Sequence, residues 1–92
     1  MTDPSEYSVE LSPAAQRQLR RLPPGGAARL RAPIIALALN PRPRDSTPLA
    51  GTLYQRVRVG DLRVVYLVDD AERLVVVLRV ARRSESTYRR LG

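Results

Sequence analysis

The chain has 92 residues, of which 43% are hydrophobic, enough for one modest core and within the range of globular proteins. It contains no Cys and no His, which excludes disulfide frameworks, thiol catalysis, zinc fingers and imidazole acid–base chemistry. The nine acidic residues are scattered without cage-like spacing, so we expect neither a metal ion nor a cofactor.

The charge balance is strongly basic. The formal net charge is +7 and the isoelectric point is near 11.2, which predicts a polyanionic partner such as nucleic acid, the ribosome, a membrane surface or an acidic protein. Residues 1–10 lack an apolar signal core, and the apolar run from Leu74 is too short to span a bilayer. We expect a single domain over residues 1–92 and a cytoplasmic location.

The first half of the chain predicts a strand followed by a helical hairpin. Residues Tyr7–Leu11 alternate between apolar and polar and favour a strand. Ser12, followed by proline, is typical of a helix cap, and the helix that begins there is expected to end at the Pro-Gly run over 23–26. A second helix is expected over Ala27–Leu39, with a bend or a late start caused by Pro33.

The second half predicts strands. Residues 40–48 are rich in proline and predict an extended connection. Two strands, Leu53–Val59 and Leu62–Asp69, flank a two-residue turn, and a third strand is expected over Arg73–Ala81. The order is that of an α+β domain: an N-terminal strand, a helical hairpin, then a three-stranded antiparallel meander with the helices packed on one face of the sheet.

The Gly60-Asp61 turn fixes the register of the first hairpin. A two-residue loop places Arg58 opposite Arg63, and side-chain alternation then gives the hairpin a core face and an outer face. A three-residue loop over Asp70–Glu72 would place Arg79 opposite Arg63. The predicted core face carries Leu53, Val57, Val59, Leu62, Val64, Tyr66 and Val68, and the outer face carries Tyr54, Arg56, Arg58 and Arg63.

Two interpretations of this arginine-rich face are open. A sheet covered by helices on one side must present polar residues on the other, and arginine serves that purpose well. However, no acidic residue alternates with these arginines, and opposing Arg58 and Arg63 costs up to about 1 kcal/mol unless an anion bridges them. A binding face for phosphate groups accounts for both features.

The sequence resembles the RelE/ParE superfamily of bacterial toxins from toxin–antitoxin pairs. Four segments carry the resemblance, in the family's order and over nearly the whole chain. They are "YSVELSPAAQRQLRRLPP" from Tyr7, "LNPRPRDSTPLAGTLY" from Leu39, "RVRVGDLRVVYLVDD" from Arg56 and "LVVVLRVARRSESTY" from Leu74.

The resemblance implies a RelE-type endoribonuclease, an mRNA interferase that cuts message in the ribosomal A site and inhibits translation without a metal ion. In this mechanism the 2′-hydroxyl attacks the adjacent phosphodiester. The positions that match the family's catalytic residues are Arg56, Arg58, Arg63, Arg83 and Tyr88, and the candidates for RNA binding are Arg79, Arg82 and Tyr54.

The identity of the general base stays open in this chain. Arginine remains protonated at physiological pH, so Arg56 and Arg58 cannot accept a proton. The alternatives are Tyr88 with a depressed pKa, a group of the ribosome, or one of the acidic residues Asp69 and Glu85.

The resemblance also implies partners and rival functions. The expected partners are a cognate antitoxin, with an acidic segment that covers the arginine face or displaces the C-terminal tail, and the ribosome with its mRNA, but no membrane. One alternative is a ParE-like inhibitor of DNA gyrase, since that branch shares the fold. Another is a catalytically degenerate toxin that only binds its antitoxin.

Overall fold

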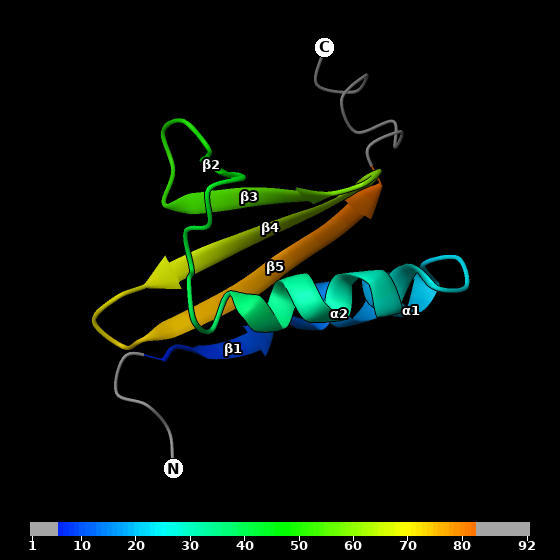
Figure 1. Ribbon diagram of the computed structural model, residues 1–92, viewed down its shortest axis with the longest axis horizontal. Coiled ribbons are helices and arrows are strands. Elements are labelled where there is room, and N and C mark those ends of the chain that lie inside the picture. The colour runs from blue at the N-terminus through cyan, green and yellow to red at the C-terminus, as the bar shows by residue number, and fades with distance from the viewer. Residues whose placement is uncertain (1–5, 83–92) are drawn as a thin grey trace.

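The computed structural model describes residues 6–82, which form one five-stranded sheet with two helices along one side of it (Figure 1). The strand order in the sheet is β1-β5-β4-β3-β2. The elements are β1 (Ser8–Leu11), α1 (Pro13–Arg21), α2 (Gly26–Ala36), β2 (Ser46–Pro48), β3 (Tyr54–Val59), β4 (Leu62–Asp69) and β5 (Leu74–Arg82).

The predicted α+β architecture is confirmed, and the sheet is larger than the predicted meander. β3, β4 and β5 form the antiparallel meander, while β1 pairs with β5 in parallel and makes the sheet mixed. The predicted connection over 40–48 contains a short edge strand, β2, antiparallel to β3. β2 is only three residues long and ends in Pro48, which is tolerated at a sheet edge because its missing N–H is not needed by another strand.

Helix α1 begins as the sequence predicts and also covers part of a sheet edge. The Ser12 hydroxyl caps the helix by accepting a hydrogen bond from the Ala15 N–H at 3.1 Å. Beyond the end of β1, two side chains satisfy the outer edge of β5: Ser12 donates to the Leu78 carbonyl at 3.0 Å, and the Gln18 amide oxygen accepts from the Val80 N–H at 2.6 Å. The helix thereby docks on β5 through its polar groups as well as through its apolar side.

Helix α2 differs from the prediction at both ends. It begins at Gly26, earlier than expected, because Gly25 takes a positive φ of 87° that glycine adopts without strain. The predicted late start is therefore wrong, and Pro33 lies inside a helix that continues through it. The helix ends at Ala36 rather than Leu39, and Leu39 is largely exposed.

The core lies between the helices and the inner face of the sheet. Tyr66 and Leu30 are fully buried in it, from β4 and α2 respectively. The prediction that Leu53 lies on the core face is wrong, because the residue is 80% exposed. It precedes β3 in a turn that is closed by a hydrogen bond from the Leu49 N–H to the Tyr54 carbonyl. The buried residues are Ala15, Leu30, Ile34, Leu37, Val57, Leu62, Val64, Tyr66, Val75, Val77 and Val80, with Val59 and Val68 packed against them.

The turn between β4 and β5 is longer than predicted. Asp69 pairs with Leu74 rather than with Arg73, so four residues form the turn, and Arg73 takes a positive φ of 51° within it. A β-bulge then inserts Leu78 between the residues that pair with Tyr66 and Val65. As a result Arg63 lies opposite Ala81, and the predicted pairing of Arg63 with Arg79 is wrong.

Candidate nucleic-acid interface

Four arginines gather on the face of the sheet that the helices leave uncovered, at the end near the Gly60 turn. We call this set, Arg56, Arg58, Arg63 and Arg79, the arginine face. Arg58 lies directly opposite Arg63, as the two-residue turn predicts. In the neighbouring row Val65 lies between its two cross-strand partners, Arg56 and Arg79. Directly paired residues project to the same side of a sheet, so guanidinium groups from three strands share one surface.

The pairing of β4 with β5 differs from the predicted register in two places, each by one residue, and together these differences put Arg79 on this face. The longer turn by itself would move Arg79 opposite the buried Val64, on the core side. The bulge at Leu78 shifts the register once more and returns Arg79 to the outer side, opposite Val65. The predicted side for Arg79 is therefore correct, although its predicted cross-strand partner is not.

Two acidic residues of the same face, Glu10 and Asp69, lie outside the arginine rows. Glu10 falls in the cross-strand row that contains Tyr54, Leu67 and Val76, beyond the arginine rows. Asp69 lies six residues along β4 from Arg63, a separation of about 20 Å at the usual rise of a strand. Its carboxylate accepts a hydrogen bond from the Glu72 N–H at 3.0 Å and so closes the β4–β5 turn. Asp69 is thus too far away to serve as a general base at the arginine face.

Carboxylates elsewhere in residues 6–82 pair with other arginines. Arg29 of α2 contacts Asp61 in the hairpin turn at 3.2 Å, which holds the acidic group nearest to the hairpin tip. Gly60 has a positive φ of 61°, which favours glycine at this turn, and a Cβ there would displace the Arg29 guanidinium. Among the residues that the structure describes, no carboxylate lies within salt-bridge distance of Arg56, Arg58 or Arg79.

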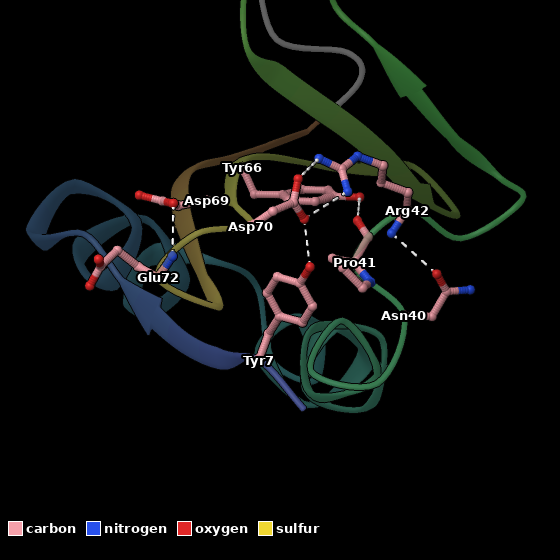
Figure 2. A network of polar contacts seen from close by, with 8 residues as sticks. All are labelled: Tyr7, Asn40, Pro41, Arg42, Tyr66, Asp69, Asp70 and Glu72. Carbon is pink, nitrogen blue, oxygen red and sulfur yellow. Dashed lines mark hydrogen bonds and ion pairs between the residues drawn. The ribbon is translucent and has the colours of Figure 1, made fainter. Parts of the chain in front are cut away.

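A second polar cluster lies at the opposite end of β4 (Figure 2). We call Tyr7, Arg42 and Asp70 the Asp70 clamp. Arg42 donates two hydrogen bonds to the Asp70 carboxylate, at 2.9 and 3.1 Å, and the Tyr7 hydroxyl donates a third at 2.5 Å. Next to it the Tyr66 hydroxyl donates to the Pro41 carbonyl at 2.7 Å. These contacts tie the chain that leaves α2 to β1 and to the β4–β5 turn.

The electrostatics of the clamp follow from these contacts. Hydrogen bonds from Arg42 and then from Tyr7 hold the pKa of Asp70 below its ordinary value of 3.8. The same carboxylate raises the pKa of the Tyr7 hydroxyl and that of the Arg42 guanidinium. Burial raises the pKa of the Tyr66 hydroxyl. The positive charge of Arg42 is therefore paired with the Asp70 carboxylate within the protein.

The remaining predicted site residues divide into three groups. Tyr54 lies on the outer face, 41% exposed, opposite Leu67 in the row next to Arg56. Arg82 pairs with the buried Leu62 and therefore projects to the helix side of the sheet, away from the arginine face. Arg83 and Tyr88, together with the possible base Glu85, lie outside the described residues.

The structure adds Thr47 to the candidates. It is exposed on β2 directly opposite Arg56, so the row that contains Arg56, Val65 and Arg79 ends in a hydroxyl group. The signal in the sequence was weak, because a strand of three residues that ends in proline lacks the length from which alternation is recognised.

Residues 6–82 bring together no group of three acidic, His or Cys side chains that could hold a metal ion. No helix within these residues has the length and apolar character needed to cross a bilayer.

Comparisons with known proteins identify the family of this small α+β domain. Residues 9–87 match the family model for the ParE toxin of the type II toxin–antitoxin system parDE. The chain therefore belongs to this toxin family.

Individual relatives are of the RelE type. The toxin RelE of Mycobacterium tuberculosis is 38% identical, over 94% of this chain and 91% of its own. Among solved structures, the toxin–antitoxin complex RelBE2 of M. tuberculosis matches with a TM-score of 0.75 and 31% identity, covering 92% of this chain and 100% of that one. The archaeal RelE–RelB complex of Pyrococcus horikoshii matches with a TM-score of 0.76 and 28% identity, covering 87% and 98%. The protein is a type II toxin of the RelE type.

Proposed function

We propose that this toxin is a metal-independent endoribonuclease that cleaves mRNA on the ribosome, with the arginine face as its phosphodiester-binding site. The observation that carries the proposal is the opposition of Arg58 and Arg63, with Arg56 and Arg79 in the next row and no described carboxylate paired with Arg56, Arg58 or Arg79. Like charges in this position are unfavourable in the free protein and become favourable when an anion lies between them.

The proposed chemistry is charge stabilisation by fixed groups. The 2′-hydroxyl gives its proton to a base and attacks the neighbouring phosphorus, which forms a pentacovalent phosphorane with more negative charge than the ground state. The P–O5′ bond then breaks, which leaves a cyclic phosphate on one fragment, and the 5′-oxygen takes up a proton on the other. Guanidinium groups held on adjacent strands are already oriented and donate hydrogen bonds to the oxygens of the phosphorane, which lowers the barrier. Because arginine does not release its proton, these residues stabilise the transition state and do not act as the base.

The base is proposed to come from outside the described residues. Within 6–82 the acidic candidate that the sequence offers, Asp69, is used in a turn about 20 Å from Arg63. Tyr88 keeps the role that the family resemblance gives it, and a ribosomal group is the alternative. This division would explain why the toxin requires the ribosome: the protein supplies the electrostatic part of the site and the complex supplies or positions the base.

We propose that a cognate antitoxin binds the toxin and keeps it inactive. The RelE–RelB structures that match this chain are complexes of a toxin with its antitoxin. In this protein a neutralising segment with acidic side chains would complement the positive charge of the arginine face. A complex that leaves both this face and the C-terminal tail untouched would contradict that part of the proposal.

A cleavage assay on translating ribosomes tests the proposal. We expect the wild-type protein to cut mRNA in the A site, and Arg63→Ala to reduce the rate about 100-fold, the usual cost of removing one fixed donor to an oxyanion. Arg17→Ala is the matched control, because Arg17 is exposed on α1 and its loss changes the net charge equally. A variant that retains growth arrest after both Arg63→Ala and Tyr88→Phe would contradict the assignment of catalytic residues.

Inhibition of DNA gyrase is the second candidate function, and it is favoured by the family model, which is that of ParE. The two functions make opposite predictions in one experiment. Intact mRNA together with gyrase-linked DNA breaks on expression would establish the ParE activity. Cleaved mRNA with intact DNA would establish the RelE activity. A protein that produces neither effect but binds its antitoxin would be a degenerate toxin.

A further inference from the structure

A cleft of about 430 Å³ lies where the end of β5 meets the end of α1. Three arginines line it, Arg21 from the last turn of α1 and both Arg79 and Arg82 from β5, together with the amide side chain of Gln18. None of its lining residues is acidic; the remainder are Leu22, Pro23, Val80 and Ala81. Its chemistry is therefore that of an anion site, with three arginines and no carboxylate among the described residues that line it.

The cleft is continuous with the arginine face. Along β5 successive side chains point to opposite sides, so Arg79 belongs to the outer face while Arg82 projects to the helix side. Both line the same cleft because β5 has no neighbouring strand there: β1 pairs only with residues 74–77. Arg79 thus contributes to both sites, and a path of positive charge runs around the open edge of the sheet.

The remaining charges nearby do not neutralise this path. Asp61 lies in an adjacent small cavity that Arg82 also lines, but its carboxylate is engaged by Arg29. Arg17 and Arg20 of α1 are exposed and do not line the cleft. The amide oxygen of Gln18 accepts a hydrogen bond from the Val80 N–H at 2.6 Å, which fixes this side chain at the wall of the cleft.

We propose that this cleft is a second phosphate subsite, in which Arg21 and Arg82 bind the RNA backbone next to the phosphodiester that the arginine face holds. The proposal rests on the proposed function for the identity of the ligand. A single-stranded RNA chain that crosses the sheet edge at Arg79 would place one phosphate at the arginine face and a neighbouring one in the cleft. Such contacts add affinity without base specificity, because phosphate carries no sequence information.

Salt-dependent binding of two RNA probes tests the subsite with the full-length chain. The probes are a trinucleotide and a nonanucleotide, both with 2′-O-methyl groups that prevent cleavage. For the nonanucleotide, Arg21→Gln and Arg82→Gln should each lower the slope of log K against log salt concentration by about 0.7, the value for one contact with single-stranded nucleic acid. The trinucleotide, which occupies only the arginine face, should bind the variants as it binds the wild type.

Arg17→Gln is the control for the charge change, and thermal melting of each variant confirms that it is folded. If Arg17→Gln lowers the slope as much as Arg21→Gln, the effect is general charge and the subsite does not exist. If Arg21→Gln and Arg82→Gln change neither probe's binding but abolish binding of a polyglutamate peptide, the cleft is a site for acidic protein, and the RNA proposal is overturned.

The result of the RNA-binding test of the subsite can be distinguished from the result of the cleavage assay. Normal cleavage by Arg21→Gln and Arg82→Gln with unchanged RNA slopes would overturn the subsite alone and leave the endoribonuclease intact. Absence of mRNA cleavage by the wild-type protein, with the slope changes as expected, would overturn the proposed activity and leave an RNA-binding subsite.

Discussion

The two ends of β4 use arginine in opposite ways. At one end Arg42 donates two hydrogen bonds to the Asp70 carboxylate, so its positive charge is paired within the fold. At the other end Arg58 faces Arg63 across the hairpin, and Asp61, the nearby acid, is engaged from the helix side by Arg29. The same residue type thus pairs with a carboxylate of the fold at one end and lies opposite a like charge at the other. We propose that the second arrangement binds an external anion, and the tests below separate this role from one that merely keeps the protein soluble.

The sharpest test of the contrast is Arg58→Ala. We expect the rate of mRNA cleavage on ribosomes to fall about 100-fold, because one fixed donor to the phosphorane is removed. The stability should stay the same or rise by up to about 1 kcal/mol, because Arg63 loses a like-charged neighbour. The two measurements are a cleavage time course and urea unfolding. A loss of stability with unchanged cleavage would assign Arg58 to the fold instead.

At the end of β4 near the Asp70 clamp we expect the reverse pattern, a loss of stability without a loss of cleavage. The first variant that tests this is Tyr66→Phe. The variant keeps the buried ring and loses the hydroxyl, which donates a hydrogen bond to the Pro41 carbonyl and also interacts with the Ser46 side chain. We expect a loss of about 1 kcal/mol in the free energy of unfolding. Cleavage at a temperature where the variant is folded should match that of the wild type. A large loss of activity in a fully folded Tyr66→Phe would show that the two ends are coupled.

Arg42→Ala should have a smaller effect of the same kind. Both partners of its ion pair are about half exposed, at 48% and 57%, so water already screens the interaction. We expect a small decrease in the melting temperature and no change in RNA cleavage. Arg44→Ala, an exposed neighbour in the same loop, is the control for charge. A fall in cleavage caused by Arg42→Ala but not by Arg44→Ala would contradict the division between the two ends.

The smallest predicted effect is a difference in pH dependence. The pKa of Asp70 is lowered in the folded state, so its contribution to stability is present above the ordinary pKa of 3.8 and is lost as the pH falls through the lower folded value. Asp70→Asn should therefore lose less stability than the wild type on acidification below about pH 4. Unfolding curves at a series of pH values measure this, and parallel curves for the two proteins would contradict it.

The sequence predicted those parts of the site that local rules determine. The Gly60-Asp61 turn determines the hairpin register, so the opposition of Arg58 and Arg63 was predictable from two residues. Alternation along β5 likewise places Arg79 and Arg82 on different faces. In both cases the information lies in residues that are close together in the chain.

The parts that sequence analysis missed depend on contacts between distant segments. The parallel pairing of β1 with β5 and the bulge at Leu78 involve distant parts of the chain, such as Ser12 and Leu78, which are 66 residues apart and joined by a hydrogen bond. Arg42 looked like one more exposed cation, because its partner Asp70 lies 28 residues away. The cleft residue Arg21 gave no signal either, because its neighbours there come from β5.

The most direct test of the central claim is an NMR titration of the full-length protein with a non-cleavable 2′-O-methyl RNA, observed at the arginine Nε–Hε groups. If arginines from adjoining strands form one phosphodiester site, the signals of Arg56, Arg58 and Arg63 shift together with a single dissociation constant. The signals of Arg42 and Arg29, which are held by carboxylates, stay in place. Equal shifts for all five, or shifts confined to the clamp, would contradict the account.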